Sequence, residues 1–350
     1  MLLLTLGVCV VIFSNVEAGI APQKFCLDCM PFYNCKNAKN LIDREKNEHT
    51  RQLIQKSFCG LRNRTVEICC SEFDAVPTIN IRSFGHPNLG LLPPSCGVIA
   101  QDRIVGGVEA GIFEFPWMAV LAYGDEKKFG CAGTLINSRY VLTAAHCVVN
   151  KEITNVRIGD FNLVQELDCQ GNICERHVQN FEVEEDDVHD DYDPSNFRND
   201  IALLRLKSSA SYPKRNVNAI CLPTTREMQQ QTITNKLATV CGWGLDEHGN
   251  KFSILRKVDI NVLPNSYCEE YYSHLSESNH NQFCAGEPKK DSCRGDSGGP
   301  LMLDIDMGPI TKIVQYGIVS HGPHRCGEQG PGIYTDVRQY INWILDHIKE

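Results

Sequence analysis

The 350-residue sequence lacks an apolar stretch long enough to cross a membrane, because a span needs about 20 such residues and the apolar run at 1–13 is shorter. Basic residues are also few, since 34 Lys and Arg stand against 43 Asp and Glu, giving a formal charge of −9. Nucleic acids and anionic membranes attract clusters of Lys and Arg. The sequence therefore argues against a membrane span and against nucleic acid as a partner.

Internal repeats and low-complexity tracts are likewise absent. Hydrophobic residues make up 42% of the chain, which excludes a fully disordered protein. A length above about 300 residues exceeds the usual size of one hydrophobic core, so we expect a large domain and a smaller one.

Cysteine, in contrast, is abundant, with 18 residues. The apolar run at 1–13 followed by Val16-Glu17-Ala18 predicts a signal peptide over 1–18, and many cysteines are typical of an oxidising compartment. We therefore expect a secreted, extracellular protein. Asn63-Arg64-Thr65 is the single N-x-S/T sequon, so Asn63 is a candidate glycosylation site.

The cysteines and prolines divide the remaining chain into three parts. Six cysteines lie within 26–70, a segment too small to be stable on a hydrophobic core alone, so we expect three disulfides there. Residues 71–103 form a linker and activation segment, with an extended Pro- and Gly-rich connector over 71–94. Residues 104–350 contain many short Val-, Ile- and Leu-rich runs, which predict an all-β fold, and only 337–348 has the apolar spacing of a helix.

Three short motifs carry reactive side chains. Gly295-Asp296-Ser297-Gly298-Gly299-Pro300 places a serine between glycines, which leave room for a substrate to approach its hydroxyl. A serine hydroxyl becomes a nucleophile only when a base accepts its proton. Thr143-Ala144-Ala145-His146-Cys147 supplies a histidine, and Asn199-Asp200-Ile201 supplies an aspartate at the start of an apolar strand.

Together these motifs resemble those of the chymotrypsin-type serine proteases, over all of 104–350. The resemblance implies a chymotrypsin-like double β-barrel with a C-terminal helix. It implies that Ser297 attacks the scissile carbonyl, that His146 transfers the proton, and that Asp200 orients the imidazole. The backbone N–H groups of Gly295 and Ser297 would form the oxyanion hole.

The same resemblance indicates the substrate. Asp291, six residues before the nucleophile, corresponds to the floor of the specificity pocket, where a substrate Arg or Lys supplies the missing charge. Gly322 and Gly332 correspond to the pocket walls, and Ser320 corresponds to a residue that supports the buried aspartate. His321 departs from the family, which usually has a bulky aromatic residue there.

Arg103-Ile104-Val105-Gly106-Gly107 resembles a zymogen junction. Cleavage after Arg103 would free the amino group of Ile104 to pair with Asp296. We therefore expect the protein to be made as an inactive zymogen that another trypsin-like protease, or the protein itself, activates.

Family positions imply the disulfide pairing of the large domain: Cys131–Cys147, Cys268–Cys284, Cys293–Cys326, and Cys96–Cys221, which would tether the N-terminal segment after activation. Cys169 and Cys174 are close enough in sequence to bridge one loop. Cys241 is left over, either as a buried free thiol or as one end of an intermolecular bridge.

Residues 26–70 resemble the clip domain of arthropod extracellular proteases, which implies the pairs Cys26–Cys69, Cys29–Cys59 and Cys35–Cys70. The resemblance extends to prophenoloxidase-activating factors and Toll-cascade proteases. It implies a haemolymph protein that acts in melanisation or Toll signalling, with a downstream zymogen as substrate, an upstream activating protease and a serpin-type inhibitor. Alternatives are a digestive or venom protease, or a non-catalytic clip adaptor, against which the intact motifs argue.

Asp160, Asn162 and Asp168 precede Cys169 and offer oxygen atoms of the kind that Ca²⁺ prefers. Some related proteases bind calcium in this loop. The alternative is an acidic exposed loop without a metal.

Overall fold

The structure, a computed structural model of the whole chain, consists of two compact units, Met1–Phe73 and Asp74–Glu350. Its description covers residues 29–35, 38, 57–62, 65–70, 85–98, 109–126, 128–245, 252–272, 281–286, 295–307, 311–323 and 330–350. Within these ranges, no helix has the length and apolar character required to cross a membrane.

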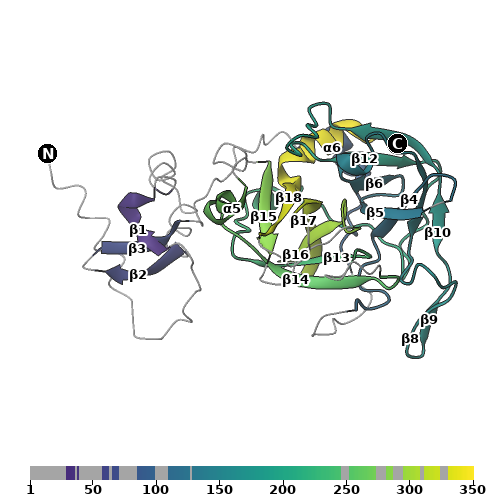
Figure 1. Cartoon of the computed structure of the whole chain (residues 1–350), viewed down its shortest axis with the longest axis horizontal. Coiled ribbons are helices and arrows are strands. Elements are labelled where there is room, and N and C mark those ends of the chain that lie inside the picture. Colours follow the sequence, from purple (N-terminus) through teal and green to yellow (C-terminus); the bar gives the residue numbers. More distant parts are fainter. Residues whose placement is uncertain are drawn as a thin grey trace. The chain divides into compact units, whose positions relative to one another are not determined.

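The first unit contains a three-stranded antiparallel sheet (Figure 1). Its strands lie in the order β1 (Cys29–Pro31), β3 (Thr65–Cys69) and β2 (Phe58–Arg62), and the 3₁₀ helix η1 (Phe32–Asn34) follows β1. Among the described residues of this unit, the buried hydrophobic ones are Cys35, Ala38, Ile68 and Cys69. Disulfides therefore supply much of its stability. Two of them, Cys29–Cys59 and Cys35–Cys70, lie in the described part, and Cys69 is also disulfide-bonded.

The second unit contains two large antiparallel sheets, which Figure 1 shows side by side. The seven strands of the first follow the order β10 (Gln179–Phe181), β7 (Ile153–Ile158), β4 (Met118–Tyr123), β5 (Lys128–Leu135), β6 (Tyr140–Thr143), β12 (Ala202–Leu206) and β11 (Val183–Val188). The second closes into a six-stranded barrel in the order β13 (Leu237–Gly242), β14 (Arg256–Val262), β15 (Gln282–Gly286), β18 (Gly332–Asp336), β17 (Thr311–His321) and β16 (Pro300–Asp306).

Shorter elements complete the second unit. They are the hairpin β8 (Asp168–Gln170) and β9 (Ile173–Glu175), the 3₁₀ helices η4 (Pro87–Leu91), η5 (Ala145–Cys147) and η6 (Val337–Tyr340), and the helices α4 (Arg226–Gln229), α5 (Asn265–Tyr271) and α6 (Ile341–His347). The predicted all-β class, with barrel-like sheets and a helix at the C-terminus, is confirmed. The sequence pattern did not separate η6 from α6, because both continue one apolar stripe.

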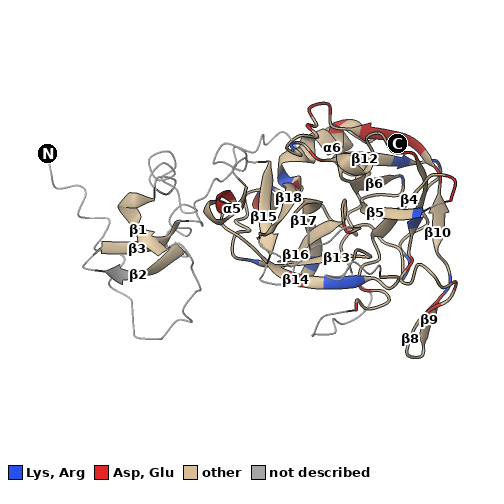
Figure 2. Ribbon diagram, in the orientation of Figure 1, with Lys and Arg blue, Asp and Glu red and all other residues tan. Residues whose placement is uncertain are grey.

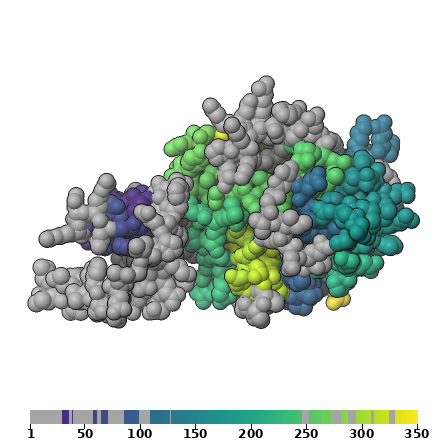
Figure 3. All heavy atoms as spheres, turned by 90° about the horizontal axis from the view of Figure 1, so that it is seen from below, coloured from purple at the N-terminus to yellow at the C-terminus, as the bar shows by residue number. Residues whose placement is uncertain are grey.

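One hydrophobic cluster joins the first sheet to Met302 and Ile318 of the barrel, and a second cluster lies within the barrel. Figure 3 shows the second unit as spheres, with the first sheet in blue to teal and the barrel in green to yellow. Trp117, fully buried beside β4, donates its indole N–H to Met302 Sδ of β16 at 3.3 Å. The buried Thr134 hydroxyl of β5 donates to Gln315 Oε1 of β17 at 2.7 Å. Such contacts fix the relative position of the two sheets, because neither apolar face can be exposed without a large loss of buried area.

The C-terminus packs against the first sheet. The apolar side chains predicted to share one stripe, from Val337 to Ile348, are buried. Lys349 Nζ lies 2.7 Å from Glu185 Oε2 of β11, a strand whose acidic residues form part of the red edge near the C-terminus in Figure 2. This docking holds α6 on the body of the second unit.

Residues 85–98 differ from the extended connector expected over 71–94. They form η4 and pack against the C-terminal helix, where Asn88 Nδ2 donates to the carbonyl oxygens of Leu345 and Ile348 at 2.9 and 3.1 Å. His86 Nε2 lies 2.9 Å from Asp346 Oδ1. Leu89, Leu91 and Leu92 add apolar contacts to the core. The Pro and Gly content of this segment had suggested an extended connector without such contacts.

Candidate active site

The three reactive side chains come from the two different sheets. His146 lies in η5, directly after β6, and Asp200 lies just before β12, so pairing of β6 with β12 brings these two residues together. Ser297 lies just before β16 of the barrel. Packing of the sheets therefore places the serine beside the histidine.

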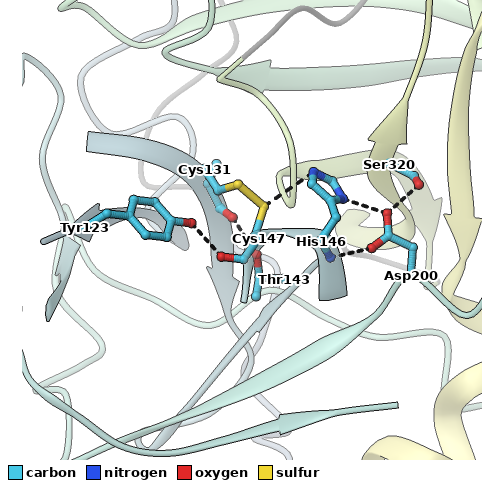
Figure 4. Close-up of a disulfide and its surroundings, with 8 residues drawn as sticks. Tyr123, Cys131, Thr143, His146, Cys147, Asp200 and Ser320 are labelled. Atoms are coloured by element: carbon cyan, nitrogen blue, oxygen red, sulfur yellow. Dashed lines mark hydrogen bonds and ion pairs between the residues drawn. A yellow bond between two sulfur atoms is a disulfide. The ribbon is translucent and has the colours of Figure 1, made fainter. Parts of the chain in front are cut away.

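His146 and Asp200 make two hydrogen bonds (Figure 4). The backbone N–H of His146 donates to Asp200 Oδ1 at 2.9 Å, and its Nδ1 lies 2.8 Å from Asp200 Oδ2. Asp200 is fully buried, whereas the His146 side chain is 18% exposed. The buried carboxylate thus orients a partly exposed imidazole, whose Nε2 lies 3.6 Å from Cys147 Sγ. Partial exposure is what proton transfer to and from a substrate requires.

Asp200 is itself held by its surroundings. Its second carboxylate oxygen also accepts a hydrogen bond from the buried hydroxyl of Ser320. Its backbone oxygen accepts one from Thr335 Oγ1 at 2.9 Å. The preceding Asn199 adopts a left-handed backbone (φ 55°), and its side-chain oxygen accepts a bond from Tyr340 Oη at 2.8 Å.

The loop around Ser297 requires its glycines. Gly295 has φ +104° and Gly298 has φ +80°, which are left-handed conformations that disfavour other residues. A Cβ on Gly298 would collide with Thr143 Oγ1 and the carbonyl oxygen of Ala132. Close approach of this loop to β5 and β6 is therefore possible only without a side chain at 298.

The backbone around Ser297 is arranged for an anion. The N–H groups of Gly295 and Ser297 make no hydrogen bond to any residue that the structure describes. The neighbouring Asp296 turns its carboxylate away toward Gly244, whose N–H donates to Oδ1 at 2.9 Å. A Cβ on Gly242 or Gly244 would overlap that carboxylate, which explains both glycines around Trp243.

A cavity of about 560 Å³ is lined by His146 and Ser297. Its other lining residues are Tyr123, Gly124, Gly130, Cys131, Lys151, Glu152, Leu245 and Gly295. Burial lowers the pKa of Lys151, an effect opposed by the Asp200 carboxylate.

No hydrogen bond joins Ser297 Oγ to His146 Nε2 among the residues described, and such bonds often tighten only when substrate binds.

Cys131 lines this cavity and forms a disulfide with Cys147, which Figure 4 shows beside His146. Its two sulfurs and the His146 ring lie within 4.8 Å of one another, a spacing that metal ligands also have. Because both cysteines are consumed in the disulfide, they offer no thiolate to a metal. The disulfide instead fixes η5, and with it His146, to β5.

An aromatic group flanks the site on the side of β17. The rings of Phe197 and His321 stack with centroids 4.5 Å apart and an angle of 20°. Tyr272 meets His321 edge to face at 6.1 Å, and Phe197 meets His146 edge to face at 5.8 Å. His321 thus replaces the expected bulky aromatic residue with another flat ring.

Of the expected pocket residues, Gly332 is buried in β18, and Gly322 is exposed just after β17. Ser320 contacts Asp200, which is the supporting position that the resemblance implied. Several other expectations lie outside the described residues: the signal peptide, Asn63, Arg103, Ile104, Asp291, and the pairs Cys26–Cys69 and Cys293–Cys326.

The remaining four expected disulfides of the second unit's described part are present: Cys96–Cys221, Cys131–Cys147, Cys169–Cys174 and Cys268–Cys284. Cys241 is a free, buried thiol, and burial raises its pKa well above the usual value. A buried thiol does not bridge to another molecule without local unfolding, so the intermolecular alternative disagrees with the structure.

The three residues of the candidate calcium site are buried, because Asp160, Asn162 and Asp168 have exposures of 6%, 7% and 3%, whereas residues 164–167 between them are exposed. Asp160 Oδ1 is buried without a hydrogen-bond partner, although Arg157 contacts Oδ2 at 3.1 Å. Burial and, to a lesser extent, the neighbouring Asp168 raise the pKa of Asp160 to about 6. These two carboxylates therefore do not lie on an exposed surface, and the unpartnered oxygen fits a cation ligand.

Three residues that support the site were not among those expected from the sequence. Asn199 stabilises the backbone before Asp200, Phe197 stacks on His321, and Lys151 lines the cavity. The left-handed backbone at Asn199 is one that Asn tolerates better than most residues, so Asn-Asp at the start of a strand is a weak signal. The other two depend on distant contacts.

The geometry defines a serine hydrolase site between two packed β-sheets, and comparison with known proteins identifies the class. A family model for trypsin matches residues 104–344, and one for the regulatory CLIP domain of proteinases matches residues 28–70. CLIP domain-containing serine protease HP8 of Bombyx mori is 34% identical over 341 residues, covering 92% of each chain. Melanization protease 1 of Drosophila melanogaster is 35% identical, covering 92% of this chain and 90% of that protein.

A solved structure agrees with these relatives. The crystal structure of the Drosophila Grass clip serine protease of the Toll pathway aligns with a TM-score of 0.66 and 31% identity, covering 91% of this chain and 93% of that one. The chain belongs to the trypsin family of serine proteases. More narrowly, it is a clip-domain serine protease, and its activity is that of a trypsin-like serine endopeptidase.

Proposed function

We propose that the protein is the secreted zymogen of an endopeptidase that cleaves after Arg or Lys and acts in an extracellular innate-immune cascade. The observation that carries the proposal is the double hydrogen bond between His146 and Asp200, with Ser297 lining the same cavity. The printed names of two relatives, a melanization protease and a protease of the Toll pathway, support the cascade. The disulfides support an oxidising, extracellular setting.

In the proposed reaction, Ser297 Oγ attacks the scissile carbonyl and its proton passes to His146 Nε2. Asp200 stabilises the imidazolium that results, through the bond at Nδ1. The N–H groups of Gly295 and Ser297 then bind the oxyanion, and donors of this kind typically contribute about 3 kcal/mol each to the transition state. His146 finally returns the proton to the leaving amine.

Specificity for Arg or Lys rests in this proposal on Asp291 as the carboxylate at the base of the pocket. Gly332 and Gly322 carry no side chains that would obstruct a long basic residue. Ser320 lies next to the pocket in this proposal, and its hydroxyl donates a hydrogen bond to the catalytic Asp200.

Activation follows from cleavage between Arg103 and Ile104. The new amino group of Ile104 would pair with Asp296, next to Ser297. Removing one partner of a buried ion pair typically costs about 3 to 5 kcal/mol, so the uncut chain would lack the energy that holds the oxyanion loop in place. The Cys96–Cys221 disulfide would keep the N-terminal part attached after the cut.

The proposed partners are proteins. The substrate would be a downstream zymogen, such as a prophenoloxidase or the next protease of the cascade. An upstream protease with specificity for arginine would activate the chain, and a serpin-type inhibitor would end its activity.

We also propose a structural Ca²⁺ held by Asp160, Asn162 and Asp168. The buried, unpartnered Asp160 Oδ1 next to a second carboxylate supports it. A bound cation would supply positive charge to these carboxylates and stabilise the loop that precedes the Cys169–Cys174 bridge; catalysis itself needs no cofactor in this proposal.

An activation assay tests the function. Replacing Ala100→Ile, Gln101→Glu and Asp102→Gly creates an Ile-Glu-Gly-Arg sequence, so that coagulation factor Xa makes the cut after Arg103. The cut protein, but not the uncut protein or a cut Ser297→Ala variant, should bind a fluorescent organophosphate and hydrolyse arginine esters. A cut wild-type protein that never takes the label would refute the proposed enzyme.

A pocket variant tests the specificity separately. Asp291→Ser should lower kcat/KM for arginine and lysine esters by at least about a hundredfold, because the substrate charge loses its partner in a desolvated pocket. It should leave organophosphate labelling of Ser297 intact. Unchanged preference for basic substrates would show that Asp291 does not define the pocket.

A further inference from the structure

A chain of hydrogen bonds extends beyond the three reactive residues to His321. His146 Nδ1 lies 2.8 Å from Asp200 Oδ2, and the same oxygen accepts a hydrogen bond from Ser320 Oγ. His321 Nδ1 in turn lies 3.2 Å from Ser320 Oγ. Four side chains, His321, Ser320, Asp200 and His146, are thus connected in series.

The direction of the last bond follows from the number of hydrogens. A serine hydroxyl has one hydrogen and two lone pairs. Ser320 is buried and gives its hydrogen to a buried carboxylate, which is the strongest acceptor available to it. Its contact with His321 can therefore be attractive only if His321 Nδ1 carries a hydrogen and donates it. The imidazole must be protonated at Nδ1, whether it is neutral or charged.

Neighbouring rings hold the imidazole in the plane that this bond needs. His321 stacks on Phe197 at 4.5 Å with an angle of 20°, and Tyr272 contacts it edge to face at 6.1 Å. Aromatic pairs in these arrangements are favourable beyond the area that they bury. The donor is consequently preorganised, so its bond to Ser320 costs little side-chain entropy.

We propose that His321 is a positioning residue for catalysis, acting through Ser320 on Asp200. A hydroxyl that accepts a hydrogen bond becomes a stronger donor, because bonds in a chain polarise one another. Donation from His321 therefore strengthens the bond from Ser320 to Asp200 Oδ2, the oxygen that orients His146. This inference rests on the proposed function, since it concerns the same catalytic residues.

Two substitutions separate the hydrogen bond from the ring. His321→Phe keeps a flat ring to stack on Phe197 but has no N–H. His321→Asn loses the ring, yet its amide nitrogen can occupy the place of Nδ1 and donate to Ser320. A positioning role through Ser320 predicts that Asn preserves turnover and Phe does not, whereas a role in packing alone predicts the reverse.

The experiment uses full-length protein cut at the engineered factor Xa sequence, with a single-residue arginine ester that reaches no farther than the specificity pocket. His321→Phe should lower kcat about fivefold with KM unchanged, as expected for one neutral hydrogen bond. His321→Asn should keep kcat within about twofold of wild type. In a Ser320→Ala background, His321→Phe should cause no further loss, because the mediating hydroxyl is absent.

The inference is overturned if His321→Phe leaves kcat unchanged, if His321→Asn is as slow as His321→Phe, or if the losses of His321→Phe and Ser320→Ala multiply. Near-ultraviolet circular dichroism of each variant, compared with wild type, reports whether the aromatic packing is retained. Failure of the proposed function looks different, because wild-type protein would then neither bind the organophosphate nor hydrolyse the ester.

Discussion

Gly298 packs directly against Thr143, and this contact joins the loop that carries Ser297 to the strand that ends before His146. The Thr143 hydroxyl donates to the carbonyl oxygen of Ala132 at 2.8 Å, so β5, β6 and the nucleophile loop meet at one point. The distance between Ser297 and His146 therefore depends on the absence of a side chain at Gly298.

Gly298→Ala should abolish activity, because the added Cβ meets both Thr143 Oγ1 and Ala132 O at a left-handed φ of +80°. We expect kcat to fall at least about a hundredfold, since small displacements of reacting groups have effects of this size. The measurement is arginine-ester hydrolysis by the cut enzyme.

Gly171→Ala is the matched control for Gly298→Ala. Gly171 also has a left-handed backbone (φ +62°), but nothing lies within 4 Å of its would-be Cβ in the β8–β9 turn. It should cost about 1 kcal/mol of stability from backbone strain while kcat stays unchanged. Equal losses of kcat in the two variants would mean that the contact with Thr143 does not position Ser297.

Asn199→Ala should impair catalysis by loosening the backbone before Asp200. The substitution removes the bonds with Tyr340 Oη (2.8 Å) and Asp191 O (2.8 Å) and places Ala at φ 55°. We expect a loss of about 2 to 3 kcal/mol in unfolding free energy and a lower kcat with little change in KM.

Asn199→Gly distinguishes the two causes, since Gly adopts the same backbone without strain but makes no side-chain bonds. Its loss of stability should lie between those of wild type and Asn199→Ala in urea denaturation. If all three proteins have the same midpoint and the same kcat, Asn199 does not support Asp200.

Calcium should stabilise the second unit. At a Ca²⁺ concentration of about 100 times its Kd, the proposed site would add about 2.7 kcal/mol of unfolding free energy, which raises Tm by several degrees. Asp160→Asn should remove the response, because it neutralises the carboxylate with the unpartnered oxygen.

Glu175→Gln is the control for the calcium experiment, because Glu175 belongs to the neighbouring strand β9 but is already engaged by His177 at 2.8 Å. It should respond to Ca²⁺ as wild type does. Calorimetric scans in EDTA and in Ca²⁺ measure the effect, and a wild-type Tm that is the same in both would eliminate the metal site.

His189 should make stability depend on pH. Burial lowers the pKa of this imidazole, against the opposing effect of nearby Asp191 and Asp190, and its ring packs on Tyr340 and Trp343. The folded state then binds the proton more weakly than the unfolded state. The stability contributed by neutral His189 is therefore present above pH of about 6.5 and is lost as the pH falls through the window below it.

His189→Phe and His189→Gln both lack the titrating group, so each should show a smaller decrease in unfolding free energy between pH 7.5 and 5.5 than wild type does. Urea titrations at the two pH values measure it. A decrease as large as that of wild type in both variants would assign the pH dependence to other groups.

The catalytic motifs were readable because each is local. The glycines that allow the conformation of the Ser297 loop are adjacent to Ser297 in the sequence, and the cysteine that fixes His146 is the next residue. Each catalytic residue could therefore be recognised from its immediate neighbours. The structure brings His146 and Asp200 into contact and places Ser297 on their cavity, although the sequence separated the first two by 54 positions.

Composition alone did not predict which segments pack against the rest of the protein. Residues 85–98 have the Pro and Gly content of a connector, yet three leucines pack against the core and Asn88 donates to the C-terminal helix. The acidic stretch before Cys169 suggested either a metal site or a solvated loop, and the sequence did not show that Asp160 and Asp168 are buried.

The amino-acid order alone determined which groups this protein can use: a serine among glycines, a histidine fixed by a disulfide, an aspartate entering an apolar strand, and paired cysteines in both units. Only the tertiary structure decided how they cooperate. Ser320 lies 120 positions from Asp200, and its contact with His321 requires a hydrogen on Nδ1 of that ring in our proposal. Such relations depend on strand pairing and on the packing of two sheets, which no short segment encodes.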